Sequence, residues 1–595
     1  METFGKKTAD IHKKLFVWIE PALVKCKNIV MRIYVFLLPA FLIIKKILAP
    51  VCRVFKKAKP GLMAFNLILA LYITIVVMLH NISIPISNIK AVCASGILLL
   101  CLVYLAITLF VREFNVAISR NKNKKMLSWK TICIFLIVSA IVFAIFYINF
   151  MEHYPGGIST DNVDQWKQVQ SKVFDNLHPA IHSMLIWLVT RIVNNYAFVI
   201  KIQILCFALM SGYLSATLVS WGIKMRWIAV FVFIILSPRT TYGILLYAWK
   251  DNAFTIILMC LTAYMVNIVF SDGVWLKKWY NIAAFSIVFA LSSLLRHNGI
   301  FFTVPLLLAI LFFIRKAKLF TVITIAASLL AVFGITNGLY KSAKVKQHEA
   351  HVYYEAVGLP MTILGGVLVN NGEALDDETR QFLFKIANEQ YWKRNFKTGD
   401  YNSVKWSLYE HQMEVIKEIP PKDLLNMTVK AIKNAPNEAL REFIGLTGYV
   451  WDPFYHDGNI VYWNNGTTLG FLYTREEMTF IKPTKDKYTE INKKIKEVLD
   501  LITPYRLLTS VGLNMLALLI AGIYSMNRNL GYKSLFLFIP IAAFNICTML
   551  IISGPEYRYF HFNTVITFPL ILALLARVKG RKGRKIELRN EGKWG

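Results

Sequence analysis

Long apolar segments, each close to twenty residues, recur along this 595-residue chain and are separated by short loops rich in lysine and arginine. A helix needs about twenty apolar residues to cross the hydrocarbon core of a bilayer. Hydrophobic residues make up 56% of the sequence, above the roughly 45–50% of typical soluble domains. The pattern therefore predicts a polytopic α-helical membrane protein whose solvent is the lipid bilayer.

We predict about twelve transmembrane helices, of which several in the middle of the chain are short. They lie at 62–80, 91–111, 131–149, 197–220, 228–247, 253–270, 281–295, 299–314, 319–339, 504–525, 533–552 and 562–577. The apolar part of 34–55 is too short to span and is predicted to be an interfacial amphipathic helix. The segment 178–195 reaches Arg191 too early to span, so we expect a helix lying along the membrane surface.

The positive charge of the chain is concentrated in loops and tails that this set of spans places on one side of the membrane. The formal net charge is +32, and the positive-inside rule assigns that side to the cytoplasm together with both termini. A nucleic-acid partner is excluded, because it would require a basic face on a folded domain. The eight cysteines are scattered without a CxxC pair, so neither a disulfide framework nor a structural zinc site is predicted.

The spans divide the chain into six parts. These are an N-terminal cytoplasmic and interfacial region (1–60), two additional N-terminal spans (61–130), a transmembrane core (131–339) with a polar loop (150–195), an extracytoplasmic domain (340–503), C-terminal transmembrane helices (504–577) and a basic cytoplasmic tail (578–595). The 340–503 part is predicted to be mostly helical, because stretches within it place acids early and bases late at helical spacing.

Two carboxylates follow the third predicted span, in the stretch Tyr154-Pro-Gly-Gly-Ile-Ser-Thr-Asp161-Asn-Val-Asp164. The preceding glycines and hydroxyl residues predict a turn and then a helix capped at Ser159, Thr160 or Asp161. Asp161 and Asp164 would share a face of that helix. One interpretation is a cap with a solvated surface residue. The other is a general base, since the positive end of a helix dipole stabilises a carboxylate in its charged form.

Two histidines open the surface helix, with Pro179 at a first-turn position. His178 and His182 are four residues apart, a spacing that could hold a metal ion, but no glutamate completes a zinc-protease pattern. The alternative without a functional role is that these histidines only form hydrogen bonds at the membrane interface. For His178 we favour a contact to phosphate or substrate.

Three further polar stretches fall on the same side of the membrane. They are Trp249-Lys250-Asp251, Arg296-His297-Asn298-Gly299 and Glu556-Tyr557-Arg558-Tyr559. Each could be an interfacial anchor, because arginine and lysine near span ends reach into the headgroup region. Taken together they supply an anion site, since guanidinium groups offer a planar donor fork to phosphate.

These motifs resemble the membrane glycosyltransferases of the GT-C fold. Asp161 followed by His178-Pro179-Ala-Ile resembles the family's acid and His-Pro-Pro-Leu pattern. Trp249-Lys250-Asp251 is similar to its second acidic turn, and Glu556-Tyr557-Arg558-Tyr559 to its late Arg-Tyr element. The stretches Tyr154-Pro-Gly and Val357-Gly-Leu-Pro360 look like an uncharacterised bacterial branch of the family. The chain departs from the pattern at Asn162, where the family often has glutamate, and at Ala180, where it has proline.

The resemblance implies transfer of a sugar from a polyprenyl-phosphate donor, of the undecaprenyl type, at the extracytoplasmic face. Asp161 or Asp164 would be the base in an inverting reaction. Donor phosphate would be bound by residues among His178, His182, Lys250, Asp251, Arg296, His297, Arg558 and Tyr559. The acceptor would be a cell-envelope glycan or a teichoic-acid-type polymer of a bacterium. No cofactor is certain, and a divalent metal at Asp161 and Asp251 stays an open alternative.

Two other functions compete with this one. A polysaccharide polymerase or ligase would use glycans linked to a lipid diphosphate, and such enzymes usually depend on paired arginines in large loops. A flippase or transporter would carry ionisable residues or broken helices near the middle of the membrane, often in repeated halves. The charges here lie at span ends and no repeat is evident, which favours the transferase.

Overall fold

The computed structural model describes residues 60–80, 95–105, 107, 118–121, 128–455, 482–502 and 508–578. The chain divides into two compact units, Met1–Thr74 with Ile86–Phe114, and Ile75–Pro85 with Asn115–Gly595. Within the first unit the structure describes most of α2 (Pro60–His80) and an apolar helix, Ser95–Leu105. The predictions for residues 1–59, including the interfacial helix at 34–55, and for the tail after 578 lie outside the described residues.

The described part of the chain is about 81% helical, and six of its helices are long and apolar enough to cross a membrane. They are Trp129–Glu152, Tyr196–Ser220, Lys250–Ser271, Lys318–Tyr340, Gly531–Met549 and Tyr557–Leu575. Each coincides with a predicted span, and the other six predicted spans fall on apolar helices that are shorter within the described residues. The prediction of a helical membrane protein is confirmed at this level.

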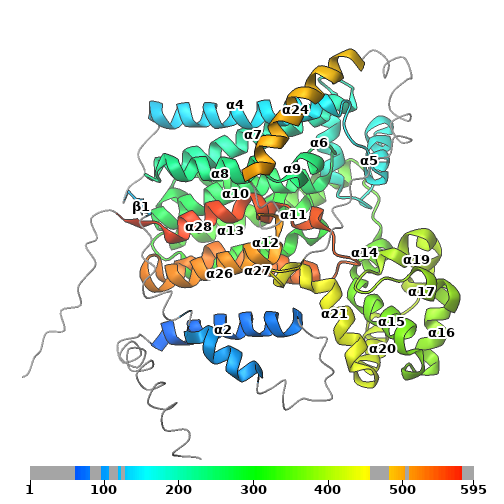
Figure 1. The fold of residues 1–595 in the computed structure, drawn as a ribbon. Coiled ribbons are helices and arrows are strands. Elements are labelled where there is room, and N and C mark those ends of the chain that lie inside the picture. Colours follow the sequence, from blue (N-terminus) through cyan, green and yellow to red (C-terminus); the bar gives the residue numbers. More distant parts are fainter. Residues whose placement is uncertain are drawn as a thin grey trace, which may run out of the picture. The chain divides into compact units, whose positions relative to one another are not determined.

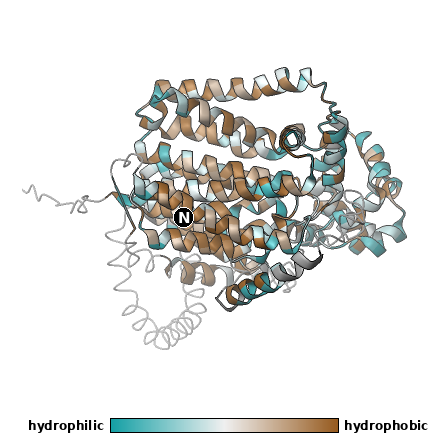
Figure 2. Cartoon of the chain, turned by 90° about the horizontal axis from the view of Figure 1, so that it is seen from above, coloured by the Kyte–Doolittle hydropathy of each residue, from teal (hydrophilic) through white to brown (hydrophobic). Residues whose placement is uncertain are grey.

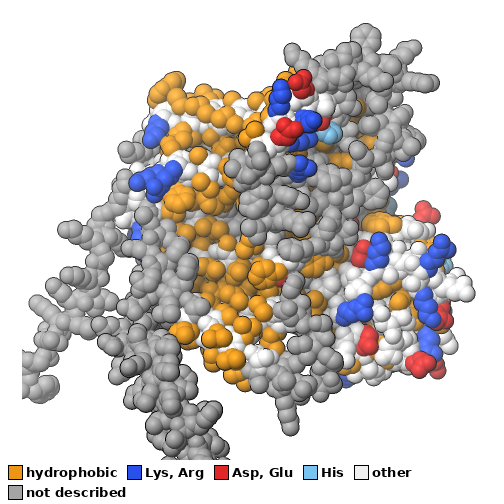
Figure 3. Space-filling model, viewed as in Figure 1, with side chains coloured by type: hydrophobic (Ala, Val, Ile, Leu, Met, Phe, Trp, Pro, Cys, Tyr) orange, Lys and Arg blue, Asp and Glu red, His pale blue; other side chains and the backbone are white. Residues whose placement is uncertain are grey.

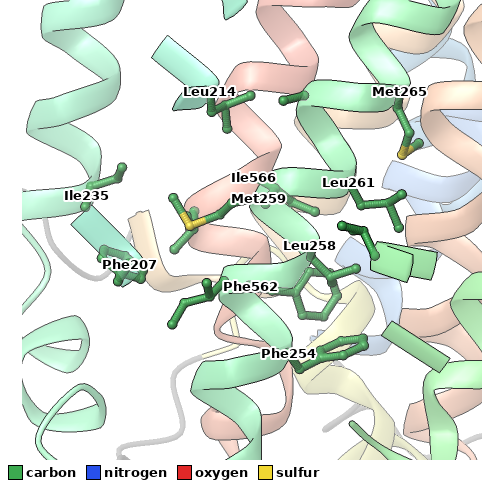
Figure 4. Close-up of a cluster of buried hydrophobic side chains, with 14 of the residues drawn as sticks. Phe207, Leu214, Ile235, Phe254, Leu258, Met259, Leu261, Met265, Phe562 and Ile566 are labelled. Atoms are coloured by element: carbon green, nitrogen blue, oxygen red, sulfur yellow. The ribbon is translucent and has the colours of Figure 1, made fainter. Parts of the chain in front are cut away.

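The second unit contains a bundle of apolar helices (Figure 1). In this bundle α4 (Trp129–Glu152) packs on α7 (Tyr196–Ser220), α11 (Trp279–Leu294) on α13 (Lys318–Phe333), α12 (Ile300–Phe313) on α27 (Ser534–Met549), and α26 (Val511–Arg528) on α28 (Phe562–Leu575). Helix α10 (Lys250–Ser271) is the most buried of the six long helices. Its Phe254, Leu258 and Met259 pack close to Phe562 and Ile566 of α28 (Figure 4).

Apolar side chains also cover much of the bundle surface. Figure 3 shows them over the bundle, and the helices are brown along their length in the hydropathy view of Figure 2. Leu136 and Ile137 of α4 and Leu330 and Phe333 of α13 are among those exposed. Soluble proteins rarely expose contiguous apolar patches beyond a few hundred square ångströms. A surface of this kind is suited to lipid.

One predicted span is divided in the structure. The segment 228–247 was expected to be a single helix, but it forms α8 (Met225–Leu236) and the short α9 (Arg239–Ile244). Pro238 stands at the break, because proline has no N–H to donate and its ring clashes with the preceding helical turn. The chain therefore ends one helix and begins another before it reaches Lys250.

At one end of the bundle a two-residue parallel pair joins β1 (Ser119–Arg120) to β2 (Arg577–Val578). The hydropathy pattern of the chain did not indicate this strand pair. At the other end lies α6 (Ala180–Thr190), whose eleven residues are too few to span a membrane, as expected from 178–195.

A helical domain follows the π-helical turn η4 (Gly334–Tyr340) and lies at the right of Figure 1. It comprises α14 (Glu349–Ala356), α15 (Gly358–Asn371), η5 (Gly372–Ala374), α16 (Asp377–Ile386), α17 (Glu389–Asn395), α18 (Asn402–Lys405), η6 (Trp406–Leu408), α19 (Tyr409–Lys417) and α20 (Pro421–Asn434). Its own core runs from Tyr354 to Ala439 and is centred on residues such as Leu364, Leu383 and Trp392.

The remainder of the predicted 340–503 domain packs on the bundle. Helix α21 (Pro436–Trp451) leads back to α26 and α27, and α24 (Lys482–Ile502) lies against α4. Asn492 and Lys496 of α24 both hydrogen-bond the Glu152 carboxylate at the end of α4, Lys496 with an N–O distance of 3.2 Å. The separate core of the helical domain, from Tyr354 to Ala439, thus covers less of the chain than the predicted domain at 340–503.

A buried carboxyl joins α21 to the helical domain. The Gly399 amide donates a 2.7 Å hydrogen bond to the Oε2 atom of Glu442, whose side chain is buried. The Oε1 atom is buried and has no hydrogen-bond partner within the described residues. Burial raises the pKa of Glu442 to about 7. The folded protein therefore holds a proton here that the unfolded chain, with a glutamate pKa of about 4.3, loses at lower pH.

We expect the stability of the protein to fall as the pH rises from about 4.3 to about 7 and then to level off, because the folded state binds the extra proton in that range. Glu442→Gln should remove this slope and raise the free energy of unfolding at pH 8 by on the order of 3 kcal/mol. Thermal unfolding across pH 4.5–8 measures the pH dependence of stability. Glu418→Gln, which changes an exposed glutamate, is the control. Equal slopes in wild type and Glu442→Gln would contradict the prediction.

Candidate active site

The glycine-containing loop before α5 (Thr160–Ser171) is held against the turn before α10. The Gly157 amide donates to the Leu246 carbonyl at 2.9 Å. The Asn162 side chain donates to the Ala248 carbonyl at 2.8 Å. A side chain at position 157 would collide with the ring of Tyr247, which explains the glycine there. Two segments some ninety residues apart in the chain are thereby held side by side.

Helix α5 begins where the sequence predicted. Ser159 is the N-cap residue, and its backbone amide donates to the Asn162 side chain at 3.2 Å. The Trp249 indole donates to the Ser159 hydroxyl at 2.8 Å, which joins the cap to the α10 turn. Asp161 therefore lies in the first turn of α5, directly opposite the start of α10.

Asp161 lies between two cations that come from distant parts of the chain. Its Oδ2 atom is 3.4 Å from Lys250 Nζ and 3.2 Å from an Arg558 Nη atom. The Asp161 side chain is 21% exposed, so solvent reaches the group only in part. Burial opposes ionisation, but the charges of Lys250 and Arg558 outweigh it and hold the pKa of the Asp161 carboxyl well below its usual range. The carboxylate is charged at neutral pH.

Asp164 is placed differently. It lies one turn further along α5 and is exposed, and no ion pair of Asp164 is present among the described residues. The sequence left the choice of base between Asp161 and Asp164 open. In the structure Asp161 is the one that faces the cations.

The two histidines have separate surroundings. His178 precedes α6, and its Nδ1 atom is 3.2 Å from Lys250 Nζ. His182 is buried inside α6, with its Nδ1 atom 2.9 Å from the side-chain nitrogen of Gln165 on α5. His178 therefore belongs to the group of charged residues around Asp161, whereas His182 fastens α6 to α5.

A second ion pair, between Arg296 and Asp251, involves the residue that follows Lys250 in the chain. Arg296, which precedes η3 (His297–Gly299), forms a buried salt bridge with Asp251 of α10. Its Nε atom donates to Asn298 at 3.0 Å, and its guanidinium lies 4.9 Å from the ring centre of Tyr559. Arg296 was predicted to bind phosphate or to reach the interface as an anchor. Instead it is buried and paired, while the exposed His297 approaches the Leu177 carbonyl at 3.4 Å.

Arg558 is surrounded by groups that determine its orientation. Its Nε atom donates to Glu556 at 2.6 Å, and one Nη atom donates to the Tyr559 hydroxyl at 3.1 Å. The guanidinium also lies over the rings of Trp249, at 5.3 Å, and Tyr559, at 4.9 Å. The late Arg-Tyr stretch, in η8 (Tyr557–Phe560), thus supplies both a cation and the aromatic ring beside it.

Sequence reasoning missed the contribution of the helical domain. The Asn402 side chain donates to Glu556 at 3.1 Å, and the fully buried Lys405 pairs with Glu355 at 2.7 Å. These residues had no spacing or motif that distinguished them from other polar residues of the domain. The one signal in the sequence was a lysine flanked by Val404 and Trp406, which is too weak to identify a buried cation.

The two carboxylates that the sequence offered as metal ligands are both paired with cations in the structure. Asp161 is paired with Lys250 and Arg558, and Asp251 is paired with Arg296. Within the described ranges no group of three histidine, cysteine or acidic side chains is arranged to hold a metal ion. The arrangement combines a charged carboxylate with cations that could bind an anion.

No protein-family model, no curated protein and no solved structure matches this chain.

Proposed function

We propose that this protein is a membrane glycosyltransferase of the GT-C type, with about twelve transmembrane helices and both termini in the cytoplasm. It would take a sugar from a polyprenyl-phosphate donor and transfer it to a cell-envelope glycan or teichoic-acid-type acceptor at the extracytoplasmic face. The helical domain would lie on that face and contribute to acceptor selection.

One observation carries the proposal: Asp161 lies between Lys250 and Arg558. These three residues come from three separate segments of the chain. A carboxylate can remove a proton from an acceptor hydroxyl. Lysine and arginine can neutralise the phosphate that departs. A group that could act as the base and groups that could bind the phosphate thus lie within hydrogen-bonding reach of each other.

The same geometry supplies an order of events. In the free protein the two cations are paired with Asp161. A donor phosphate that binds Lys250 and Arg558 shares their charge and adds its own negative charge nearby. Both effects raise the proton affinity of Asp161. The base would therefore become effective when the donor is bound.

The reaction then proceeds by inversion. Asp161 accepts the proton of the acceptor hydroxyl as its oxygen forms a bond to the anomeric carbon. The bond between that carbon and the phosphate oxygen breaks, and polyprenyl phosphate leaves with the bonding electrons. Lys250 and Arg558 stabilise the charge on the departing phosphate, and His178, 3.2 Å from Lys250, lies within reach of the same group.

The test is sugar transfer by the purified protein in lipid nanodiscs, supplied with short-chain polyprenyl-phosphate sugars. We expect release of polyprenyl monophosphate by the wild type. Lys250→Ala should lower kcat by about 10²–10³, the effect of losing one group that stabilises developing charge. The exposed Lys224→Ala is the matched control.

Other outcomes would identify the competing functions. Consumption of glycans linked to a lipid diphosphate, with no use of monophosphate donors, would support a polymerase or ligase. Movement of lipid-linked glycans across vesicle membranes without any transfer would support a flippase. Either result would overturn the proposed function.

A further inference from the structure

We propose that the helical domain positions Arg558 for the reaction through a hydrogen-bond chain from Asn402 to Glu556. Asn402 would be a positioning residue that acts through Glu556 and touches no substrate itself. This inference rests on the proposed function, because it assigns to Arg558 the binding of donor phosphate.

The first step is the close fit of the helical domain on the turn before η8. The backbone N–H of Asn402 donates to the Ser553 carbonyl at 3.0 Å. A side chain at Gly554 would meet Asp400 and Asn402, and one at Gly358 would meet the Ile552 carbonyl. The backbone of α15 at Gly358 therefore lies directly against the backbone of the turn, and the side chains of Asp400 and Asn402 fill the space beside Gly554.

A buried cation strengthens the same contact. Lys405 is completely buried and lies 2.7 Å from Glu355 and 3.4 Å from the Ser553 hydroxyl. A buried ammonium group without partners would be strongly unfavourable. Lys405 thus has one partner within the helical domain, Glu355, and one on the turn before η8, Ser553.

The second step is Glu556, which has one carboxylate oxygen on each side of the boundary. Its Oε1 atom accepts from the Asn402 side chain at 3.1 Å, and its Oε2 atom accepts from Arg558 Nε at 2.6 Å. Arg558 in turn reaches Asp161 at 3.2 Å. The guanidinium plane is therefore defined by a carboxylate that a residue of the helical domain holds in place.

Loss of the Asn402 donor would leave Glu556 free to rotate. Arg558 would keep its charge but lose its fixed orientation toward the phosphate. Misplacement by about 1 Å can reduce a rate by 10²-fold. We expect Asn402→Ala to lower kcat/KM for the donor by about 10-fold or more, with thermal stability close to that of the wild type.

The decisive comparison changes which of the two side chains, at position 402 or at position 556, donates the hydrogen bond between them. Asn402→Asp would place two carboxylates together and should be more damaging than Asn402→Ala. The double variant Asn402→Asp with Glu556→Gln restores a donor and an acceptor, because the new amide can donate to position 402 and accept from Arg558. Its activity should exceed that of Asn402→Asp, in which the two carboxylates face each other. Asn434→Ala, whose side chain bonds the Ala374 carbonyl in the same domain, is the control.

Each result decides a different question. If the wild type is active and Asn402→Ala matches Asn434→Ala, or if the double variant shows no rescue, the positioning role is wrong and the proposed function stands. If the folded wild type neither binds polyprenyl monophosphate nor consumes its sugar derivatives, the proposed function fails, and this inference fails with it.

Discussion

Asp161→Asn is expected to reduce the rate of sugar transfer by about 10²–10⁴-fold, the usual contribution of general-base catalysis. The asparagine amide has nearly the same shape but cannot accept the proton. The change also removes the negative charge between Lys250 and Arg558. We therefore expect a donor KM that is unchanged or lower, together with the loss of kcat. Steady-state kinetics with a polyprenyl-phosphate sugar measure both.

Asp164→Asn is the matched control, since it makes the same chemical change one turn along α5 at an exposed position. It should retain activity close to that of the wild type. A loss of kcat in Asp164→Asn with an active Asp161→Asn would reverse the assignment of the base. Full activity of both variants would falsify the proposed carboxylate mechanism.

Arg296→Ala should destabilise the protein by about 3–5 kcal/mol, the usual effect of removing one partner from a buried ion pair. Asp251 would remain buried without its guanidinium, and its Oδ2 atom already has no hydrogen-bond partner among the described residues. Thermal unfolding in nanodiscs measures the change. Arg315→Ala, which removes an exposed arginine, is expected to have a small effect.

A double variant separates the lost charge from the lost packing. Asp251→Asn combined with Arg296→Met replaces the ion pair with neutral groups and should recover much of the stability lost in Arg296→Ala. If Arg296→Ala unfolds at the same temperature as the wild type, the buried pair does not stabilise the fold, and this prediction is wrong.

The helices of the bundle could be predicted from the sequence because apolar length is a local property. The bounds of α4, α7 and α10 lie within a few residues of the predicted spans. The N-cap of α5 was predicted for the same reason, since a cap depends on neighbouring residues. The division of 228–247 was missed although its cause, Pro238, is also local.

The candidate site was predicted as a set of acids and bases, and its pairing was not. Lys250 and Asp251 are consecutive, yet Lys250 meets Asp161 while Asp251 meets Arg296. Adjacent helical residues point about 100° apart, so neighbours in sequence serve different partners. No spacing rule states which distant loop each side chain will face.

The sequence by itself determined that this chain forms apolar helices, where most of them begin and end, and which polar stretches lie at their ends. Those properties follow from hydropathy and capping within a few residues. The tertiary structure alone decided that Asp161 faces Lys250 and Arg558, that Arg296 is buried against Asp251, and that Asn402 reaches Glu556. Such contacts join residues up to hundreds of positions apart, and they depend on how whole helices pack rather than on any local preference.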